Sequence, residues 1–292
     1  MGLQGDPPNI RRLLIASPVR QDPARLRCVL EALRHLDPCG REVAWCFVDD
    51  NADPKASAMI EAWRPGRRGR LVVIKPQGLA ELDYHANDDY HVWRWNLAWR
   101  LGAIRNRLLQ EMVDLGCDAI FMFDSDVCLR PDTLHWLLSA RKDIVSELMW
   151  TRYFSGSRTL APNAWVWGES ALSPCHPWEH AHQISQRVLD QRRRAWYREI
   201  RQPGLHEVGG LGAVTLISRR AYEAGCTYTP MPRLGWWGED RFFCVRAQAR
   251  DIPLYVDSHA EPLHLYRRQD LRRWGPWRDQ HLRGQVSAVA AL

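Results

Sequence analysis

The sequence predicts an α/β protein whose central sheet is mostly parallel and flanked by helices. In the first half of the chain, short apolar runs alternate with segments of helical periodicity, which is the pattern of parallel strands joined by crossover helices. Three of these runs end in polar residues, as strands often do where they leave a buried sheet. A chain of 292 residues, 46% of them hydrophobic, is long enough to build such a sheet around a sizeable core.

Four strand–helix units are expected in the first half. The third helix is predicted from Leu101, Ile104, Leu108 and Met112, which recur at three- and four-residue spacing. A proline early in the first turn marks the start of the second helix. A polar and aromatic stretch before the third helix is long for a connection and is expected to be a functional loop. The predicted strands are 13–17, 43–48, 71–74 and 119–123, the helices are 23–36, 54–63, 95–115 and 131–140, and the loop is 76–95.

The second half is less regular. A Gly-rich turn followed by an apolar run predicts a strand within 208–218, and a very basic segment predicts a helix at 180–200. The stretch 161–177 is rich in Pro, Trp and Gly and is expected to be irregular. Further strands are expected at 144–150 and 254–256, and further helices at 239–249 and at the C-terminal end.

Composition excludes several classes of protein. No apolar run approaches the roughly 18 residues that a membrane span needs, and the first 12 residues lack the apolar core of a signal peptide, so a cytoplasmic location is expected. The eight cysteines form no CxxC pair and are expected to be mostly buried free thiols. The net charge of +6 is mild and the basic residues are scattered, so nucleic acid is not expected as a partner.

Polar residues at three strand exits are the main indication of a functional site. Ligands of open parallel sheets bind beyond the carboxyl ends of the strands, so the side chains there are expected to converge on one edge. The three exits are 18–20, 49–51 and 124–126.

Two carboxylates follow the fourth predicted strand directly. Asp124 and Asp126 are two residues apart in extended chain and can face the same way. Nearby carboxylates repel unless a cation or a proton lies between them, and oxygen ligands suit Mg²⁺ or Mn²⁺. The alternative is a structural turn or cap, because Asp is common where strands end.

The segment 119–132, AIFMFDSDVCLRPD, resembles the metal-binding strand and turn of GT-A glycosyltransferases, in particular family 2 and related bacterial enzymes. Further matches follow in the family's order, at 14–20, 48–51, 103–106, 209–212 with 217–219, 236–240 and His264. The resemblance implies a GT-A, Rossmann-like fold in one domain, 1–292. Its parts would be a nucleotide-sugar-binding half at 10–140, an acceptor-binding half at 141–270 and a C-terminal helix or tail at 271–292.

The resemblance also implies a cofactor, Mn²⁺ or Mg²⁺, and a nucleotide-diphosphate sugar, UDP- or GDP-linked, as donor substrate. The metal ligands would be Asp126, Asp124 and His264. The residues near the nucleotide and its phosphates would be Pro18, Arg20, Asp49, Asp50, Asn51, Arg105, Asp124 and Ser125. Considered without the family, His264 is equally an ordinary structural histidine, and the partner of Arg105 could be purely structural.

The stretch 235–240 resembles, locally, the Trp-Gly-Gly-Glu-Asp segment of β-1,4-galactosyltransferases, whose Asp is the base. By this match Asp240 is the catalytic base and Glu239 its acceptor-binding neighbour. Trp236, Trp237 and Gly210 would lie on the acceptor side. A base at this place predicts an inverting displacement onto an acceptor hydroxyl. The alternative is an ordinary cap, since carboxylates are common in the first turn of a helix.

Other functions stay open beside an inverting transferase. A retaining GT-A transferase would share the metal site, and a non-catalytic carbohydrate-binding protein would explain the many tryptophans. A nucleotidyltransferase would need a phosphate-binding loop after the first strand, which 17–20 does not provide, and a hydrolase would need no acceptor. The acceptor is expected to be a carbohydrate or another hydroxyl compound. The basic segment 180–200 suits an anionic acceptor or peripheral membrane association, although most charge runs are only solvated.

Overall fold

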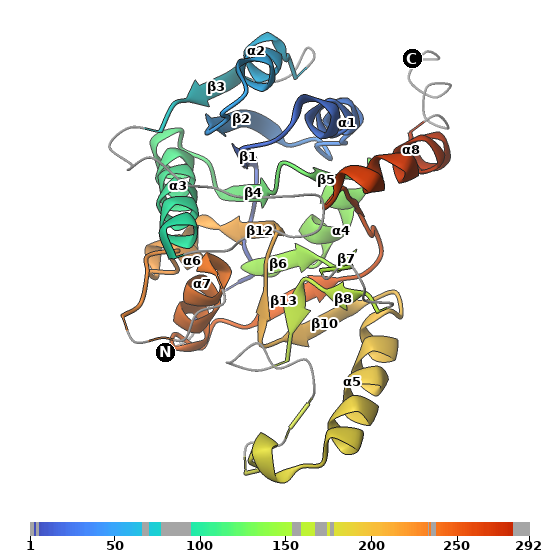
Figure 1. Ribbon diagram of the computed structural model, residues 1–292. Coiled ribbons are helices and arrows are strands. Elements are labelled where there is room, and N and C mark those ends of the chain that lie inside the picture. Colours follow the sequence, from blue (N-terminus) through green and yellow to red (C-terminus); the bar gives the residue numbers. More distant parts are fainter. Residues whose placement is uncertain are drawn as a thin grey trace.

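The computed structural model describes residues 3, 6–65, 70–76, 95–153, 159–166, 174–175, 178–232, 234 and 238–282. Its centre is an eight-stranded sheet within these residues (Figure 1), which confirms the predicted α/β fold. In order across the sheet the strands are β10 (Leu205–Val208), β13 (Leu254–Asp257), β6 (Ile144–Glu147), β12 (Val214–Ser218), β4 (Ala119–Phe123), β1 (Arg12–Val19), β2 (Glu42–Asp49) and β3 (Arg70–Ile74).

The sheet is mostly parallel, as predicted. The pairs β3–β2, β2–β1 and β1–β4 are parallel, and so is the pair β6–β13. β12 runs antiparallel to both β4 and β6, so these two flanking strands point the same way. β10 closes one edge antiparallel to β13. Six strands therefore have their carboxyl ends along the same side of the sheet. This is where the polar residues at the strand ends were expected to converge.

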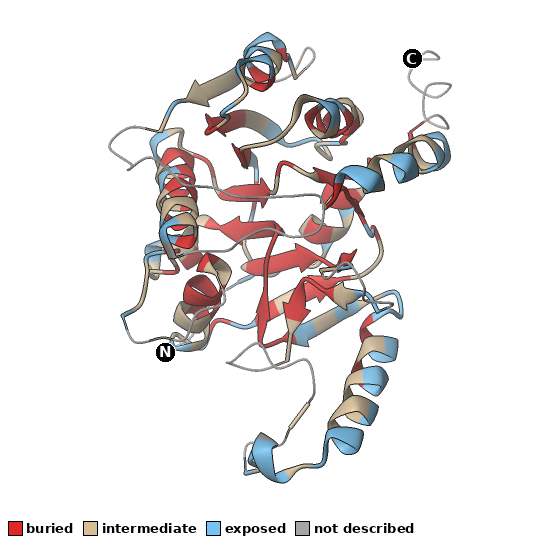
Figure 2. Ribbon diagram, viewed as in Figure 1, coloured by how far each residue is buried: buried red, intermediate tan, exposed pale blue. Residues whose placement is uncertain are grey.

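Helices cover both faces of the sheet because alternate strand residues point to opposite sides. In β1, Leu13 and Ile15 join the core on one face, and Leu14 and Ala16 join the core on the other. The first face is covered by α1 (Pro23–Leu33), α2 (Pro54–Ala62) and α4 (Thr133–Ser139), and the second by α3 (Trp95–Asp114), α6 (Arg219–Glu223) and α7 (Glu239–Gln248). Figure 2 shows the sheet as the most buried part of the molecule.

The first helices begin as the sequence predicts. Asp22 caps α1 by accepting hydrogen bonds from the backbone N–H groups of Ala24 (3.0 Å) and Arg25 (3.1 Å), and Pro23 follows the cap. Asp53 caps α2 in the same way, ahead of Pro54. Both helices end earlier than predicted, at Leu33 and Ala62.

Several elements of the second half differ from the prediction. The segment 180–200 is a short 3₁₀ helix, η1 (Ala181–Gln183), followed by α5 (Gln186–Ile200). The segment 144–150 was predicted as one strand, but β6 ends at Glu147 and a second strand, β7 (Trp150–Thr151), starts at Trp150. Two short strands, β8 (Ala161–Pro162) and β9 (Ala164–Trp165), occur where irregular chain was expected. β11 (Gly210–Leu211) precedes β12, and the C-terminal part forms η2 (Arg268–Arg273) and α8 (Trp274–His281).

Three expectations about the whole chain can be followed in the structure. The predicted loop 76–95 lies almost entirely outside the described residues. All eight cysteines are free thiols, and six of them are buried, as expected. Among the helices that the structure describes, none combines the length and the apolar character that crossing a membrane requires.

Candidate functional site

The predicted metal ligands Asp126 and His264 lie next to each other. β5 (Val127–Cys128) follows the Asp turn and pairs antiparallel with β14 (Leu263–His264), so that His264 lies opposite Val127. The backbone N–H of Leu265 donates to the Asp126 carbonyl (2.8 Å) and fixes this register. His264 Nε2 is 3.3 Å from Asp126 Oδ1. Neither β5 nor β14 was expected from the sequence, yet these two-residue strands bring the pair together.

The Asp126–His264 pair has the chemistry of a partial metal site. His264 Nδ1 lies 2.6 Å from the Thr151 hydroxyl oxygen, and if it donates there, the Nε2 lone pair faces the Asp126 carboxylate. Two neighbouring ligands of one octahedral ion with bonds of ~2.1 Å are about 3 Å apart, so the observed separation fits. In the part of the chain that the structure describes, no three His, Cys, Asp or Glu side chains gather as a metal site. Other ligands would have to complete the coordination.

The third predicted ligand, Asp124, is paired with a buried arginine. Arg105 on α3 donates from Nη2 to Asp124 Oδ1 (2.7 Å), and its side chain is only 2% exposed. Its Nη1 is 3.6 Å from Asp240 Oδ1. Its Nε is 3.1 Å from Glu239 Oε1 but lacks the alignment of a hydrogen bond. The Arg105 guanidinium thus joins the end of β4 to the first turn of α7. The sequence left the partner of Arg105 open, and the structure places three acidic side chains around it.

Burial shapes the protonation of these carboxylates. It raises the pKa of Asp124 to about 6, against the opposing charge of Arg105. Burial and the neighbouring Asp240 raise the pKa of Glu239 to about 8. Burial also raises the pKa of Asp240. Glu239 has a 3% exposed side chain, whereas Asp240 is 27% exposed. Of the two, Asp240 is therefore the one that a substrate can reach.

Glycines at neighbouring positions leave room for the carboxylates at the start of α7. A Cβ on Gly212, just before β12, would lie 2.2 Å from Asp240 Oδ2. A Cβ on Gly102 of α3 would lie 2.8 Å from the carbonyl oxygen of Tyr228 and 3.5 Å from the Cβ of Glu239. Gly238 enters α7 with φ of +100°, a conformation that favours glycine. These positions let α7 start directly beside α3 and the β12 strand.

The predicted nucleotide side is held together by charge pairs. Arg100, also on α3, makes a bidentate contact with the Asp50 carboxylate, and Arg20 Nη1 donates to the Asp50 carbonyl oxygen (3.0 Å). Pro18 is buried in β1 and Ser125 is 8% exposed. Arg100 was not predicted as a site residue. The available signal was that it belongs, with Arg105, to the helix that covers the site.

Asp49 and Asn51 are engaged within the protein. The Asp49 carboxylate accepts from Lys75, from the Ser57 hydroxyl (3.1 Å) and from the Asn51 side chain (2.7 Å). The Asn51 side-chain oxygen accepts from the backbone N–H of Gln21 (2.8 Å), which ties the exits of β1 and β2 together. In this arrangement both residues brace the edge of the sheet.

The predicted acceptor side is only partly described. Trp236 and Trp237 lie outside the described residues. Gly210 pairs with Trp165 across β11 and β9, and a Cβ at Gly210 would fall 1.9 Å from the Trp165 ring. Trp165 therefore covers Gly210, a contact that the sequence did not indicate.

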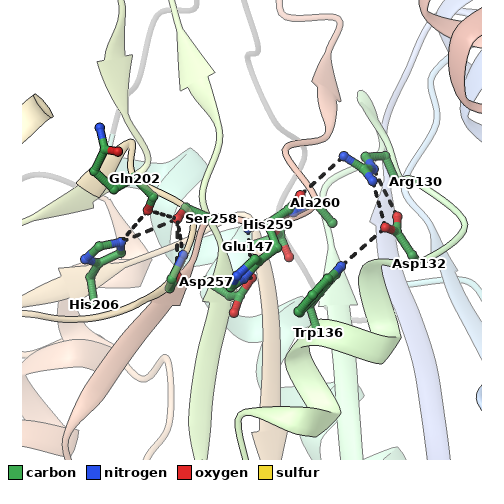
Figure 3. Close-up of polar contacts among 11 residues, drawn as sticks. Arg130, Asp132, Trp136, Glu147, Gln202, His206, Asp257, Ser258, His259 and Ala260 are labelled. Carbon is green, nitrogen blue, oxygen red and sulfur yellow. Dashed lines mark hydrogen bonds and ion pairs between the residues drawn. The ribbon is translucent and has the colours of Figure 1, made fainter. Parts of the chain in front are cut away.

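A second polar cluster lies at the ends of β6 and β13 and was not predicted (Figure 3). Buried Glu147 accepts from the backbone N–H of Ala260 (2.8 Å) through Oε1, and among the described residues its Oε2 has no hydrogen-bond partner. Asp257 Oδ1 lies 2.9 Å from His259 Nδ1, and His259 stacks on Trp136 with ring centroids 4.0 Å apart. Burial and Asp257 raise the pKa of Glu147 well above its usual range.

Comparisons with known proteins give structural neighbours only. No family model matches the chain, and no curated protein matches it. Residues 1–349 of TarS from S. aureus superpose with a TM-score of 0.48 at 14% identity, over 86% of this chain and 59% of that one. The same protein crystallised with UDP-GlcNAc gives a TM-score of 0.47 at 14% identity, over 86% of this chain and 57% of that one. This chain thus spans less than two thirds of either structure. Its own mostly parallel sheet, with the Asp turn at the carboxyl end of β4, is the arrangement that the GT-A resemblance implied.

Proposed function

We propose that this protein is a metal-dependent glycosyltransferase that moves a sugar from a nucleotide-diphosphate sugar to an acceptor hydroxyl. The observation that carries the proposal is the meeting of distant residues at one edge of the sheet. Asp126 and His264 face each other at 3.3 Å, and Arg105 links Asp124, beside them, to Asp240. If Asp124 and Asp126 formed only a structural turn and Asp240 were only a helix cap, these residues would not have to meet.

Asp126 and His264 would hold the Mn²⁺ or Mg²⁺, and diphosphate oxygens of the donor would complete its coordination. When bound, the metal neutralises the charge of the departing diphosphate. Arg105 keeps Asp124 in place beside this pair, and Arg20, Asp50 and Arg100 form the neighbouring wall for the nucleotide.

Asp240 would act as the base. It is partly exposed, and burial raises its pKa toward the range in which a carboxylate accepts a proton most effectively near neutral pH. Its carboxylate would take the proton of the acceptor hydroxyl as the oxygen attacks the anomeric carbon from the side opposite the diphosphate. The sugar would therefore be transferred with inversion.

The first test is a thermal-shift series with UDP, GDP, dTDP and CMP, each with and without Mn²⁺. UDP-GlcNAc is added as a donor because it occupies the S. aureus protein. A nucleotide at ~100 times its Kd should stabilise the protein by about 2.7 kcal/mol. We expect one nucleotide to stabilise it only with metal, and Asp126→Asn to lose that response.

Asp132→Asn is the matched control, because Asp132 pairs with Arg130 and accepts from the Trp136 ring N–H of the second polar cluster (Figure 3). Asp240→Asn should keep the nucleotide response and lose sugar transfer, with inversion checked on the wild-type product. Stabilisation by nucleotide that is independent of metal and unchanged in Asp126→Asn would refute the metal site. Near-normal transfer by Asp240→Asn would leave Asp240 as a helix cap and favour a retaining mechanism.

A further inference from the structure

Helix α5 projects from the body of the protein. Only its C-terminal part joins the core, where Trp196 and Ile200 are buried and Tyr197 packs edge-on against Trp150. Figures 1 and 2 show the rest of the helix extending past the end of the sheet, with mostly exposed or intermediate side chains. This projecting helix is far more polar than a helix that has to fill a core.

The arginines of α5 fall into two sets. Arg192 forms a bidentate pair with Glu179 (2.6 and 2.9 Å), and Arg193 pairs with Asp190 (2.6 Å). Arg192 ties the segment before α5 to the helix, and Arg193 forms an ion pair within the helix. The second set is exposed and has no carboxylate partner among the residues that the structure describes; it consists of Arg187, Arg194 and Arg198.

The second set lies on a single face. Spacings of seven and four residues place Arg187, Arg194 and Arg198 in one row along an α-helix. Trp196 and Ile200, which anchor the helix to the core, point to the opposite side by the same geometry. The row of three arginines, here called the arginine row, therefore faces away from the protein. No carboxylate in the described part of the chain neutralises its charge.

We propose that the arginine row docks the protein on an anionic lipid bilayer. The charge of the row complements lipid phosphates, which attract basic helices at close range. An exposed apolar side chain beside the row favours a bilayer over a soluble polyanion: Val188, next to Arg187 on the first turns of α5, is 37% exposed, and basic helices that lie on bilayers carry such apolar residues. The proposal does not depend on the reaction that the protein catalyses.

The test is co-sedimentation of the full chain with vesicles of phosphatidylglycerol and phosphatidylcholine, compared with phosphatidylcholine alone. We expect binding only to the anionic vesicles and its loss at ~1 M salt, where the screening length falls to about 3 Å. Replacing all three arginines by Gln should weaken binding on the order of a hundredfold, from about fivefold for each basic residue near an anionic surface.

A matched control removes the same charge elsewhere. Arg27, Arg34 and Arg41 are exposed residues in and after α1, and the triple Gln variant should bind anionic vesicles like the wild type. Equal loss in both triple variants would mean that only net charge matters, and would overturn the proposal. So would undiminished vesicle binding without the arginine row, or row-dependent retention on heparin together with no vesicle binding. Unchanged circular dichroism spectra would show that the variants are folded.

Discussion

At the scale of single residues, Arg105 is the side chain on which the site most depends. It is 2% exposed and lies among three carboxylates, so removing it leaves buried negative charge without compensation. Breaking a buried ion pair from one side costs about 3–5 kcal/mol. Arg105→Met should therefore lower the free energy of unfolding by that amount in urea denaturation at pH 7.

An exposed ion pair supplies the control for Arg105. Arg219 on α6 pairs with Glu223 (2.7 Å), their side chains are 38% and 54% exposed, and such surface pairs contribute at most ~1 kcal/mol. Arg219→Met should be nearly as stable as the wild type. If the free energy of unfolding falls equally little in both variants, the Arg105 cluster does not stabilise the junction of α3, β4 and α7.

Glu147 predicts an unusual dependence of stability on pH. Its pKa is raised in the folded protein above the ordinary 4.5, because the carboxyl is buried near Asp257. The folded state then holds this proton more tightly than the unfolded state. Its contribution to stability is complete below pH ~4.5 and is lost as pH rises through the folded pKa. Glu147→Gln has no proton to lose at this position. Its free energy of unfolding, relative to that of the wild type, should therefore increase between pH 5 and 8.

Urea denaturation at several pH values measures that difference. Glu223→Gln replaces an exposed carboxylate and should show a constant offset from the wild type. A Glu147→Gln variant that is less stable at pH 8 than at pH 5, relative to the wild type, would mean that Glu147 is ionised and paired in the folded protein.

The sequence allowed some of these residues to be predicted and not others. Asp124 and Asp126 were found because they follow an apolar strand, and Asp240 because of a local motif. The bracing role of Asp49 could not be predicted. Lys75 and Ser57 approach it only because β2 pairs with β3 and α2 packs nearby. Contacts between separate elements leave no local pattern in the chain.

At the scale of elements, the approach of α7 to β12 depends on Gly212. Its carbonyl oxygen accepts from Asn163 (2.8 Å) and from the Ser146 hydroxyl (3.1 Å), so the backbone there has little room to shift. A methyl group at this position would press on the Asp240 carboxylate. If Asp240 is the base, Gly212→Ala should reduce kcat by ~10²–10⁴-fold while nucleotide binding persists.

Gly275→Ala on α8 is the control for this substitution, because a Cβ there meets nothing within 4 Å. It should leave both kcat and nucleotide binding unchanged. Full activity in Gly212→Ala would show that Asp240 does not have to keep the position seen here.

Element boundaries followed from the sequence where capping was local. The starts of α1 and α2 were predicted at Pro23 and Pro54, and each follows a capping Asp. The basic segment 180–200 was predicted as one helix, but α5 starts only after Ser185. β14 and β5 were missed because two-residue strands have no periodicity to detect.

At the scale of the whole molecule, the two predicted halves, 10–140 and 141–270, share one sheet. β12 belongs to the second half, yet it pairs with β4 of the first half over five residues, from Val214 to Ser218. The core on each face likewise contains residues from both halves. Neither half can complete its hydrogen-bonded edge or its core without the other.

This interleaving predicts that the described body unfolds as one cooperative unit. Urea transitions followed by tryptophan fluorescence and by far-ultraviolet circular dichroism should coincide, which is the test of two-state behaviour. The isolated fragment 10–140 should lack a cooperative transition, because it exposes the edge of β4 and the apolar residues that β12 and α7 cover. Two separated transitions in the full chain, or a fragment that unfolds cooperatively, would show that the halves are independent domains despite their common sheet.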